Sequence, residues 1–537
     1  MPRLPRNVGW LAVPGMAAAW PVLVIAGNNP GEFGLADLVV ATFFAALSGL
    51  ACAAIASAIT RRVVTASLGG VVLVAAMYGP LLIRQLRWGQ WLGMYAYGPT
   101  VPLLILLITL LLLSRLRASG ERVRPALPPV TLAVATLVLL ATVQAAGSLR
   151  RAMPPTASMP VPVAPAPDSL PDIYLIVLDE YAASRVTRQL LAFDNREFQD
   201  SLRTFGFRIP TATWSNYSFT AASIASMLDM RHVDEVAGRA GRDRSLVPLN
   251  NIIAGNAAFT LARSLGYRII FVPSSGFEGT RSHPAAHRTL GPETPVEWFA
   301  EHATSPLAVE VAKLSVIGSA LKAARVRFGS PWRELGPFRR LREAVTEPGP
   351  KFVFAHAMMT HQPYQFTSDC DWATLDRPVY GLPGYRAQME CTNRQVLDIV
   401  EDILASNRPS VILLQGDHGP SVRGGFILAD PRTASAAQVA ERLGAFSAYR
   451  LPDGSTLSDT ITPVNLLRLV FNRYLGTALA LQSNNAFFSV LGRNYDFVPV
   501  DLRALTDTST LARTDPGSGV KARRPLDRSR ALSDASQ

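Results

Sequence analysis

The sequence predicts a multi-span α-helical membrane domain followed by an α/β domain with a mainly parallel central sheet. Three observations support this prediction. The 537 residues are 49% hydrophobic and only 17% charged, with a mean hydropathy of +0.19, which is too apolar for a disordered chain and unusual for a fully soluble enzyme. Apolar stretches of spanning length fill the first 150 residues. Beyond a Pro-rich break, strand patterns alternate with helical patterns, as in a parallel sheet covered by helices.

Five apolar stretches precede the Pro-rich break, and each is close to the roughly 20 residues that cross a bilayer. The run from 100 to 116 is almost unbroken, which argues against buried helices of a soluble protein. The first stretch lacks a nearby cleavage pattern and is followed by others, so we interpret it as a retained span rather than a signal peptide. The five stretches are 8–27, 35–60, 63–83, 99–116 and 127–147.

The formal charge of +12 is concentrated in this apolar part of the chain. Residues 1–151 contain twelve Arg and three acids, a net charge of +9 that leaves +3 for the rest. The charge therefore predicts membrane topology, and we expect no nucleic-acid partner. Eight of the twelve Arg lie on one side of the five stretches, which we assign to the cytoplasm: Arg3, Arg6, Arg61, Arg62, Arg115, Arg117, Arg122 and Arg124.

These features predict an integral protein of a bacterial-type plasma or inner membrane with a cytoplasmic N-terminus. Five crossings place everything after residue 150 outside the cytoplasm. Residues 151–171 include seven Pro and predict an extended linker. We expect a five-span domain at 1–150, the linker at 151–171, an extracytoplasmic catalytic domain at 172–505 and a disordered tail at 506–537.

Strand and helix patterns alternate through the extracytoplasmic part. The run Asp172 to Leu178 is continuously apolar after its first residue and predicts a buried strand. Further strands are expected at the end of 261–272, at 351–358 and at 410–414, with helices at 184–205 and 385–405. The basic stretch 308–346 predicts helices, and we interpret it as an insertion beside the active site.

Acidic and imidazole side chains follow two of the predicted strands. Asp179 and Glu180 come directly after the first strand, and Asp417 and His418 come after the strand at 410–414. The carboxyl ends of parallel strands meet at one edge of a sheet. Carboxylates with a neutral imidazole suit a divalent cation. Taken singly, each pair is more often a helix cap or a solvated loop, and the sequence leaves open whether Asp179 or Glu180 is a ligand.

A candidate nucleophile lies in 215–230, where polar turn residues lead into an Ala-rich helix. Thr220 or Ser223 would lie at or just inside the helix N-terminus. The helix dipole and an adjacent metal would lower the pKa of a hydroxyl there. The alternative is that Ser215, Ser218 and Thr220 only cap the helix.

One histidine lies near the end of the predicted strand at 351–358, and a second lies in the loop that follows it. His356 and His361 are five residues apart, so they cannot share a helix face as the two His of a zincin do. A His before the Pro-fixed loop at Pro363 suits a rigid donor to an anion or leaving group. A surface histidine is the alternative.

The order of these pieces resembles the sulfatase-like hydrolase/transferase group of the alkaline phosphatase superfamily, which includes membrane-bound lipoteichoic acid synthase-like enzymes. The pieces are the strand with its acidic pair, SNYSxTxxSxAS, HxPY, QGDHG, TPVNLLRLVFN and YDFVPVD, spread over 172–502. The resemblance implies one divalent metal, Mn, Mg, Ca or Zn. It implies Asp179 or Glu180, Thr220, Asp417 and His418 as ligands, Thr220 as nucleophile, His361 at the substrate, and His356 and Arg423 at phosphate or sulfate oxygens.

The sequence departs from true sulfatases at the nucleophile. The matching stretch reads TAASI from Thr220 and lacks the Cys and Arg of a CxPSR-like motif. We therefore expect transfer or hydrolysis of a phosphate ester through Thr220 in preference to sulfate hydrolysis, on lipid head groups or envelope glycans. The alternative is a catalytically inactive scaffold or sensor in envelope assembly. Cys370 and Cys391 both lie in the extracytoplasmic part, where an oxidising compartment permits a predicted disulfide.

Overall fold

The computed structural model describes residues 8–85, 100–150, 170–236, 244–274, 276–313, 315–316, 331–373 and 381–506. The chain divides into two compact units. One is Met1–Arg151 with Phe299–Gly329, and the other is Ala152–Trp298 with Ser330–Gln537. Nearly all of the predicted linker and the predicted tail lie outside the described residues, so both stay predictions.

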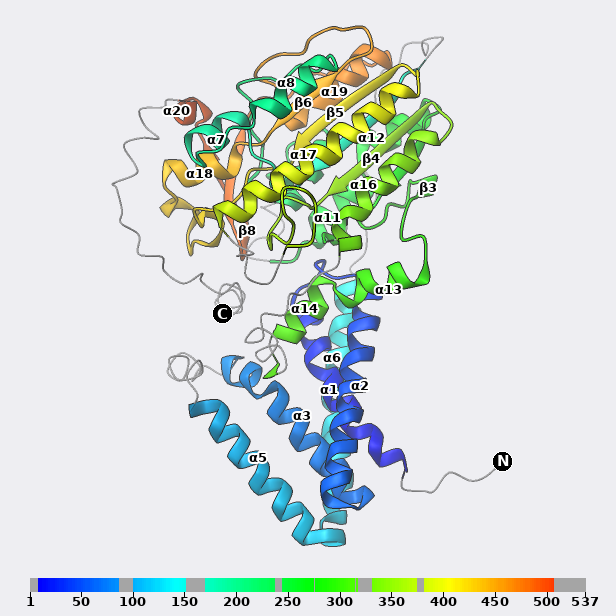
Figure 1. The fold of residues 1–537 in the computed structure, drawn as a ribbon, viewed down its shortest axis with the longest axis vertical. Helices are drawn as coiled ribbons and strands as arrows, with labels where there is room; N and C mark the ends of the chain where they lie inside the picture. Colours follow the sequence, from blue (N-terminus) through cyan, green and yellow to red (C-terminus); the bar gives the residue numbers. More distant parts are fainter. Residues whose placement is uncertain are drawn as a thin grey trace. The chain divides into compact units, whose positions relative to one another are not determined.

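The first unit is helical, and each of the five predicted apolar stretches is a helix (Figure 1). Two helical stretches, Leu35–Thr60 and Leu104–Leu149, are long and apolar enough to cross a membrane, and Ala12–Asn28 and Val63–Gly79 are shorter apolar helices. The number of crossings and the orientation stay predictions. The helices are α1 (Ala12–Asn28), α2 (Leu35–Thr60), α3 (Val63–Gln85), α5 (Thr100–Ser119) and α6 (Leu127–Arg150), with the short 3₁₀ segments η1 (Val8–Leu11) and η2 (Gly120–Ala126).

Small residues allow the helices of this unit to approach closely. A Cβ atom added to Gly49 of α2 would come within 2.2 Å of the Pro14 carbonyl oxygen of α1. Such contacts are typical of helices packed in lipid, where close backbone approach replaces the hydrophobic effect as the source of stability. Large apolar side chains of α2, α5 and α6 instead face outward, among them Phe43, Leu107 and Leu140.

A segment from the second half of the sequence belongs to the helical unit. It comprises the end of α13 (Pro295–Ala303) and α14 (Pro306–Lys313). Leu307 and Val311 are buried in the same apolar cluster as Ala18 and Val22 of α1. The first part of the predicted insertion at 308–346 thus packs with α1 and α2, and its placement beside the active site stays a prediction. An amphipathic pattern predicts a helix, but it does not say which apolar surface the helix covers.

The second unit is built around a six-stranded sheet in the order β3-β2-β4-β1-β5-β6. All neighbours pair in parallel except β5 and β6, which confirms the predicted mainly parallel sheet. The strands are β1 (Asp172–Leu178), β2 (Arg268–Val272), β3 (Arg288–Thr289), β4 (Lys351–Ala357), β5 (Ser410–Gly416) and β6 (Ser447–Arg450).

Helices cover both faces of this sheet, so alternate residues of β1 enter two different cores. Ile173, Leu175 and Val177 join one core with α9 (Thr220–Asp229), α11 (Val247–Ala254), α12 (Ala257–Ser264) and α19 (Pro463–Tyr474). Tyr174 and Ile176 join the other core with α7 (Ser184–Gln189), α8 (Arg196–Thr204), α16 (Pro331–Thr346) and α17 (Leu382–Ala405). Burial on both faces explains why β1 is apolar without alternation.

Several smaller elements complete this unit. The predicted helix at 184–205 is divided into α7 and α8, and the predicted helix at 385–405 is α17. α18 (Ala436–Leu443) begins with a capping box in which Ser435 and Gln438 bond each other's backbone. A separate antiparallel pair is formed by β7 (Ala486–Val490) and β8 (Arg493–Val500), and α20 is Leu502–Thr506. The 3₁₀ turns are η3 (Glu278–Thr280), η4 (Gly425–Ile427) and η5 (Pro431–Thr433).

Candidate active site

The carboxyl ends of three adjacent strands form the site. β1 lies between β4 and β5, and its Val177 is opposite His356 on one side and Gln415 on the other. Asp179 therefore emerges between the end of β4 and the Asp417–His418 pair. Asp179, Asp417 and His418 each present a ligand atom within 4.8 Å of the others, and so do Asp179, Glu180 and His361. The structure thus brings together the side chains that the strand pattern predicts to meet.

Thr220 joins this cluster from the first turn of α9. Its Oγ1 lies 3.1 Å from Nε2 of His418 and 3.3 Å from Oδ2 of Asp179. The side chain is half-buried, so it remains open to a reacting group. At this position the hydroxyl also lies at the positive end of the α9 dipole.

The other hydroxyls of the 215–230 segment serve the structure. Ser223 donates to the Asp417 carbonyl at 2.5 Å, and Ser215 donates to the same oxygen. Ser218 donates to the Ser489 carbonyl at 2.9 Å. The N-cap residue of α9 is Phe219, with no side-chain capping bond. The capping interpretation of these residues is therefore wrong, and the hydroxyls of Ser215 and Ser223 instead fix the backbone of Asp417.

Backbone carbonyls fix the orientation of two imidazoles. Nδ1 of His418 lies 3.0 Å from the Gly419 carbonyl, and Nδ1 of His361 lies 2.6 Å from the Gln362 carbonyl. A carbonyl only accepts, so each Nδ1 carries the proton and each Nε2 has a free lone pair when the ring is neutral. Burial, followed by the charge of Arg442, lowers the pKa of His418 well below its ordinary value. Nε2 of His418 is thus an acceptor or a metal ligand facing Thr220.

His356 is fully buried under the cluster. Its Nδ1 lies 2.8 Å from Oγ1 of Thr280, and Thr280 donates onward to Ser274, whose hydroxyl donates to the Phe277 carbonyl. This series of hydrogen bonds ends on a carbonyl, which can only accept. Each hydroxyl therefore donates towards that carbonyl, and Nδ1 of His356 carries a proton and donates to Thr280. Nε2 then faces Oδ2 of Asp179 at 3.3 Å, and burial lowers the pKa of His356 to about 4. The predicted contact of His356 with substrate stays a prediction.

Several polar atoms of the cluster are buried without a hydrogen-bond partner among the described residues. They are Oδ1 of Asp179, Oδ2 of Asp417 and Nε2 of His356. Burial raises the pKa of Asp179 to about 6 and that of Asp417 well above its ordinary value. Open carboxylate and imidazole atoms that face one another could be bridged by a cation. This donor set fits a divalent metal ion.

Glu180 and Arg442 form an ion pair at the side of the cluster. Nη1 of Arg442 lies 2.6 Å from Oε1 of Glu180, and both side chains are buried. Arg442 also contacts Nε2 of His418 at 3.3 Å. The three carboxylates Asp179, Glu180 and Asp417 therefore face one buried guanidinium. With all three carboxylates ionised, two negative charges would be left among these buried groups, and one divalent cation would neutralise them.

Arg442 was missed by the sequence analysis, which proposed Arg423. The guanidinium of Arg423 donates to the Leu190 carbonyl at 3.1 Å, while Arg442 contacts the cluster. Arg442 lies inside the amphipathic helix α18, so its local pattern is that of any helical Arg. Its distance of 24 residues from His418 carries no motif signal. The role of Arg423 stays a prediction.

A disulfide and a hydroxyl support the loop that carries His361. Cys370 and Cys391 are bonded, with 5.0 Å between their Cα atoms, and they connect the segment after β4 to α17. Thr360 donates to the Asp179 carbonyl, which ties the same loop to the end of β1. His361 is thereby held against the cluster from two sides.

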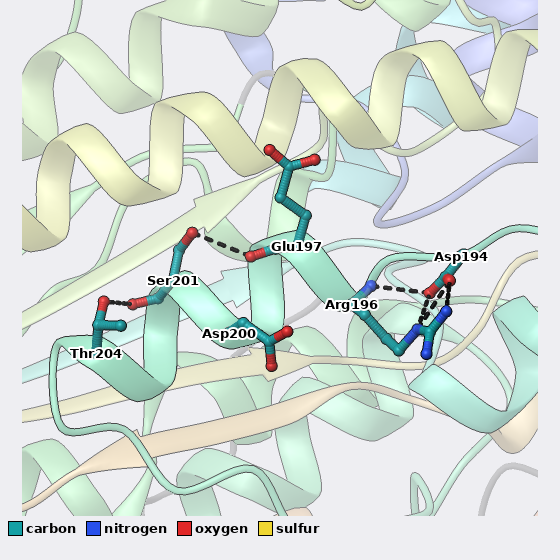
Figure 2. A pocket seen from close by; sticks show the side chains of 6 residues that line it. All are labelled: Asp194, Arg196, Glu197, Asp200, Ser201 and Thr204. Carbon is teal, nitrogen blue, oxygen red and sulfur yellow. Dashed lines mark hydrogen bonds and ion pairs between the residues drawn. The ribbon is translucent and has the colours of Figure 1, made fainter.

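A depression at α8 differs from this cluster in its chemistry (Figure 2). Its one base is already paired, because Nη2 of Arg196 lies 2.6 Å from Oδ2 of Asp194, and its other acids are Glu197 and Asp200. Ser201 and Thr204 donate to carbonyls of their own helix. Both charged partners are exposed, so we assign no function to this depression.

Comparisons with known proteins give structural similarity alone. No protein-family model matches the chain, and no curated protein matches it. Solved structures similar to this chain include a phosphoethanolamine transferase and a protein of the alkaline phosphatase superfamily.

Three of these structures illustrate the range of sequence identity and coverage. The integral membrane protein lipooligosaccharide phosphoethanolamine transferase A (EptA) from Neisseria meningitidis is 13% identical, with a TM-score of 0.39 over 89% of this chain and 96% of that chain. The periplasmic domain of EptC from Escherichia coli, in complex with Zn, is 11% identical, with a TM-score of 0.41 over 67% of this chain and 99% of that chain. An alkaline phosphatase superfamily protein from Vibrio parahaemolyticus is 11% identical, with a TM-score of 0.39 over 62% and 76%.

Proposed function

We propose that this protein is a membrane-anchored, metal-dependent transferase or hydrolase of phosphate esters that uses Thr220 as nucleophile. One observation carries the proposal. The Thr220 hydroxyl lies at a helix N-terminus, 3.1 Å from a neutral imidazole and 3.3 Å from a buried carboxylate whose charge is not balanced by the protein. This is the arrangement that activates a hydroxyl for attack on phosphorus.

The ligands that we propose for the metal are Asp179, Thr220, Asp417 and His418. We assign Asp179 rather than Glu180, because the Glu180 carboxylate is paired with Arg442 at 2.6 Å. A set of carboxylates with one imidazole suits Zn²⁺ or Mn²⁺ better than Mg²⁺ or Ca²⁺. When bound, the ion supplies Lewis acidity, which polarises a phosphoryl oxygen and lowers the pKa of the Thr220 hydroxyl.

The remaining steps belong to side chains of the chain itself. Oγ1 of Thr220 bonds to phosphorus and releases its proton to solvent, while the bond from phosphorus to the ester oxygen breaks. The leaving alkoxide takes a proton from His361, whose half-buried ring has its Nε2 free to be protonated. An acceptor hydroxyl, or water, then attacks phosphorus and passes its proton to His361, while the bond from phosphorus to Oγ1 breaks and Thr220 regains a proton from solvent. The guanidinium of Arg442 balances the charge of Glu180 throughout. Its positive charge also disfavours protonation of His418.

The substrate class follows from the predicted placement of the site. A tethered site outside the cytoplasm would reach lipid head groups and envelope glycans, so head-group transfer is the reaction that we favour. The absence of a CxPSR-like motif at Thr220 argues against sulfate hydrolysis.

Replacement of Thr220 tests the proposal. Thr220→Ala should abolish turnover of aryl phosphate and phosphodiester probes, and Thr220→Ser should retain part of it. Ser218→Ala removes a hydroxyl that bonds to Ser489 and serves as the matched control. An aryl sulfate probe should show no turnover with the natural chain. Turnover retained by Thr220→Ala would refute the assignment, and a natural chain without turnover or bound metal would favour the scaffold or sensor.

A further inference from the structure

The second half of the sequence carries a cluster of exposed apolar side chains. Six large apolar residues are exposed among those described after residue 170, and four of them lie within 21 residues. The four are Val296, Trp298, Phe299 and Val316, whereas Ile427 and Leu481 are isolated. Isolated exposed apolar residues are ordinary, but a cluster of them marks an interaction surface.

Phe299 connects this cluster to the outer surface of α2. The rings of Phe299 and Phe44 are 5.4 Å apart, and Phe44 is itself exposed. Phe43 and Leu47, on the same stretch of α2, are exposed as well. This stretch belongs to a helix long and apolar enough to cross a membrane. The apolar surface of the candidate span therefore continues onto α13.

Buried contacts hold this segment firmly in the helical unit. Nδ1 of His302 lies 2.7 Å from Oδ1 of Asp37, in the first turn of α2, and both side chains are buried. Leu307 and Val311 fill the apolar cluster of α1 and α2. The end of α13 is thus anchored on one side by the hydrogen bond between His302 and Asp37 and by apolar packing, and Phe299 remains exposed on the other side.

We infer that Phe299 and the described residues that follow it up to Val316 form a lipid-contact element that inserts into the outer leaflet at the boundary between head groups and acyl chains. Aromatic and aliphatic side chains are favoured at that depth. Continuity with the surface of α2 selects lipid as the occupant. The inference requires α2 to span the membrane, but it does not depend on the reaction chemistry. It gives the catalytic half of the sequence a second attachment to the bilayer besides the Pro-rich linker.

Spin labels at single cysteines test the inference in the full-length protein. Cys52→Ser removes the free thiol, and Cys370 and Cys391 are bonded to each other. Labels would be placed in this background by Phe299→Cys, Leu47→Cys on α2 and Leu481→Cys as an isolated exposed control. The protein would be reconstituted in nanodiscs of phosphatidylethanolamine and phosphatidylglycerol. Electron paramagnetic resonance would compare accessibility to oxygen, which partitions into lipid, with accessibility to a water-soluble nickel chelate.

The label at 299 should resemble the label at 47, with an oxygen-to-nickel accessibility ratio at least about threefold above that at 481, as expected of side chains below the head groups. A label at 299 that is as open to nickel as the label at 481 would overturn the inference. A label shielded from both reagents would also overturn it, since it would place a second copy or another protein on this surface. A lipid-exposed label at 47 beside a water-exposed label at 299 would leave the membrane span intact and refute the lipid-contact element alone.

Discussion

The two ends of strand β1 carry buried acids in opposite electrostatic situations. At the amino end, Asp172 accepts from Nε of Arg408 at 2.8 Å and lies 3.7 Å from Nζ of Lys351. At the carboxyl end, Asp179 and Asp417 keep buried oxygens without hydrogen-bond partners among the described residues. The first acid is neutralised by the protein, whereas the other two would be neutralised by the metal ion that we propose.

This difference separates a structural cluster from a functional one. An acid surrounded by two cations stabilises the place where three strands begin. It has no unbalanced charge that would attract a ligand. Acids whose charge stays unbalanced at buried positions raise the free energy of the bare fold, and binding of a cation recovers it. Burial alone does not distinguish the two clusters, because all three Asp are fully buried.

The largest effect is expected at the carboxyl end. Asp417→Asn should lower kcat/KM for a phosphodiester probe by at least about 10³-fold, because it removes a proposed ligand of the catalytic ion. Asp172→Asn should leave kcat/KM near the natural value at a temperature where it remains folded. Equal losses in the two variants would erase the distinction between the ends.

At the amino end, the loss should appear in stability. Asp172→Asn leaves Lys351 buried without its carboxylate, so the free energy of unfolding should fall by about 3–5 kcal/mol. Chemical denaturation followed by circular dichroism would measure it. Asp369→Asn removes the exposed pair with Arg394 and should cost far less. A small effect of Asp172→Asn would mean that the amino end is not held by its charges.

A buried histidine outside both clusters allows a test of pH dependence. His283 bonds through Nε2 to the Ile253 carbonyl at 2.9 Å and accepts at Nδ1 from the Ala285 amide. Burial lowers its pKa from 6.5 to about 4. As the pH falls below 6.5, His283 takes up a proton in the unfolded chain but not yet in the folded chain. The contribution of His283 to the free energy of unfolding is therefore fully present above pH 6.5 and is lost as the pH falls towards 4.

The contribution of His283 should reach at most about 3 kcal/mol. Denaturation at pH 7 and pH 4.5 should show a smaller loss in His283→Gln than in the natural chain. The same loss in both proteins would show that the imidazole is not the titrating group.

The smallest effect on turnover is expected from the ion pair between Arg442 and Glu180 at the carboxyl end. Arg442→Gln leaves Glu180 buried without its cation, and we expect turnover to fall about tenfold. The double variant with Glu180→Gln should recover part of the loss, with a coupling of at least about 1 kcal/mol. Additive losses measured by kcat/KM would mean that the pair does not act as a unit.

Much of this arrangement is predictable from sequence because it depends on strand ends. The runs that form β1, β4 and β5 are apolar on both faces, so parallel pairing brings the residues that follow them to one edge. The same logic predicts the proximity of Asp179, Asp417 and His418. It does not distinguish Asp179 from Glu180, whose backbone turns into the left-handed region at φ 56°.

The parts that escaped prediction depend on tertiary contacts. Arg442 reaches the site from α18, where its sequence pattern is that of a surface helix. Ser215 looks like a cap and Ser223 like a candidate nucleophile, and both instead bond to the Asp417 carbonyl. The helix α14 packs on α1 and α2, which its amphipathic pattern alone does not specify.

Metal content of the purified full-length protein tests the central claim most directly. Elemental analysis should find close to one divalent ion per natural chain and per Asp172→Asn chain. Asp179→Asn and Asp417→Asn should each lose most of that ion, although all three substitutions remove one buried carboxylate charge from the same sheet. Equal metal content in all four proteins, or no bound metal in the natural chain, would contradict the account.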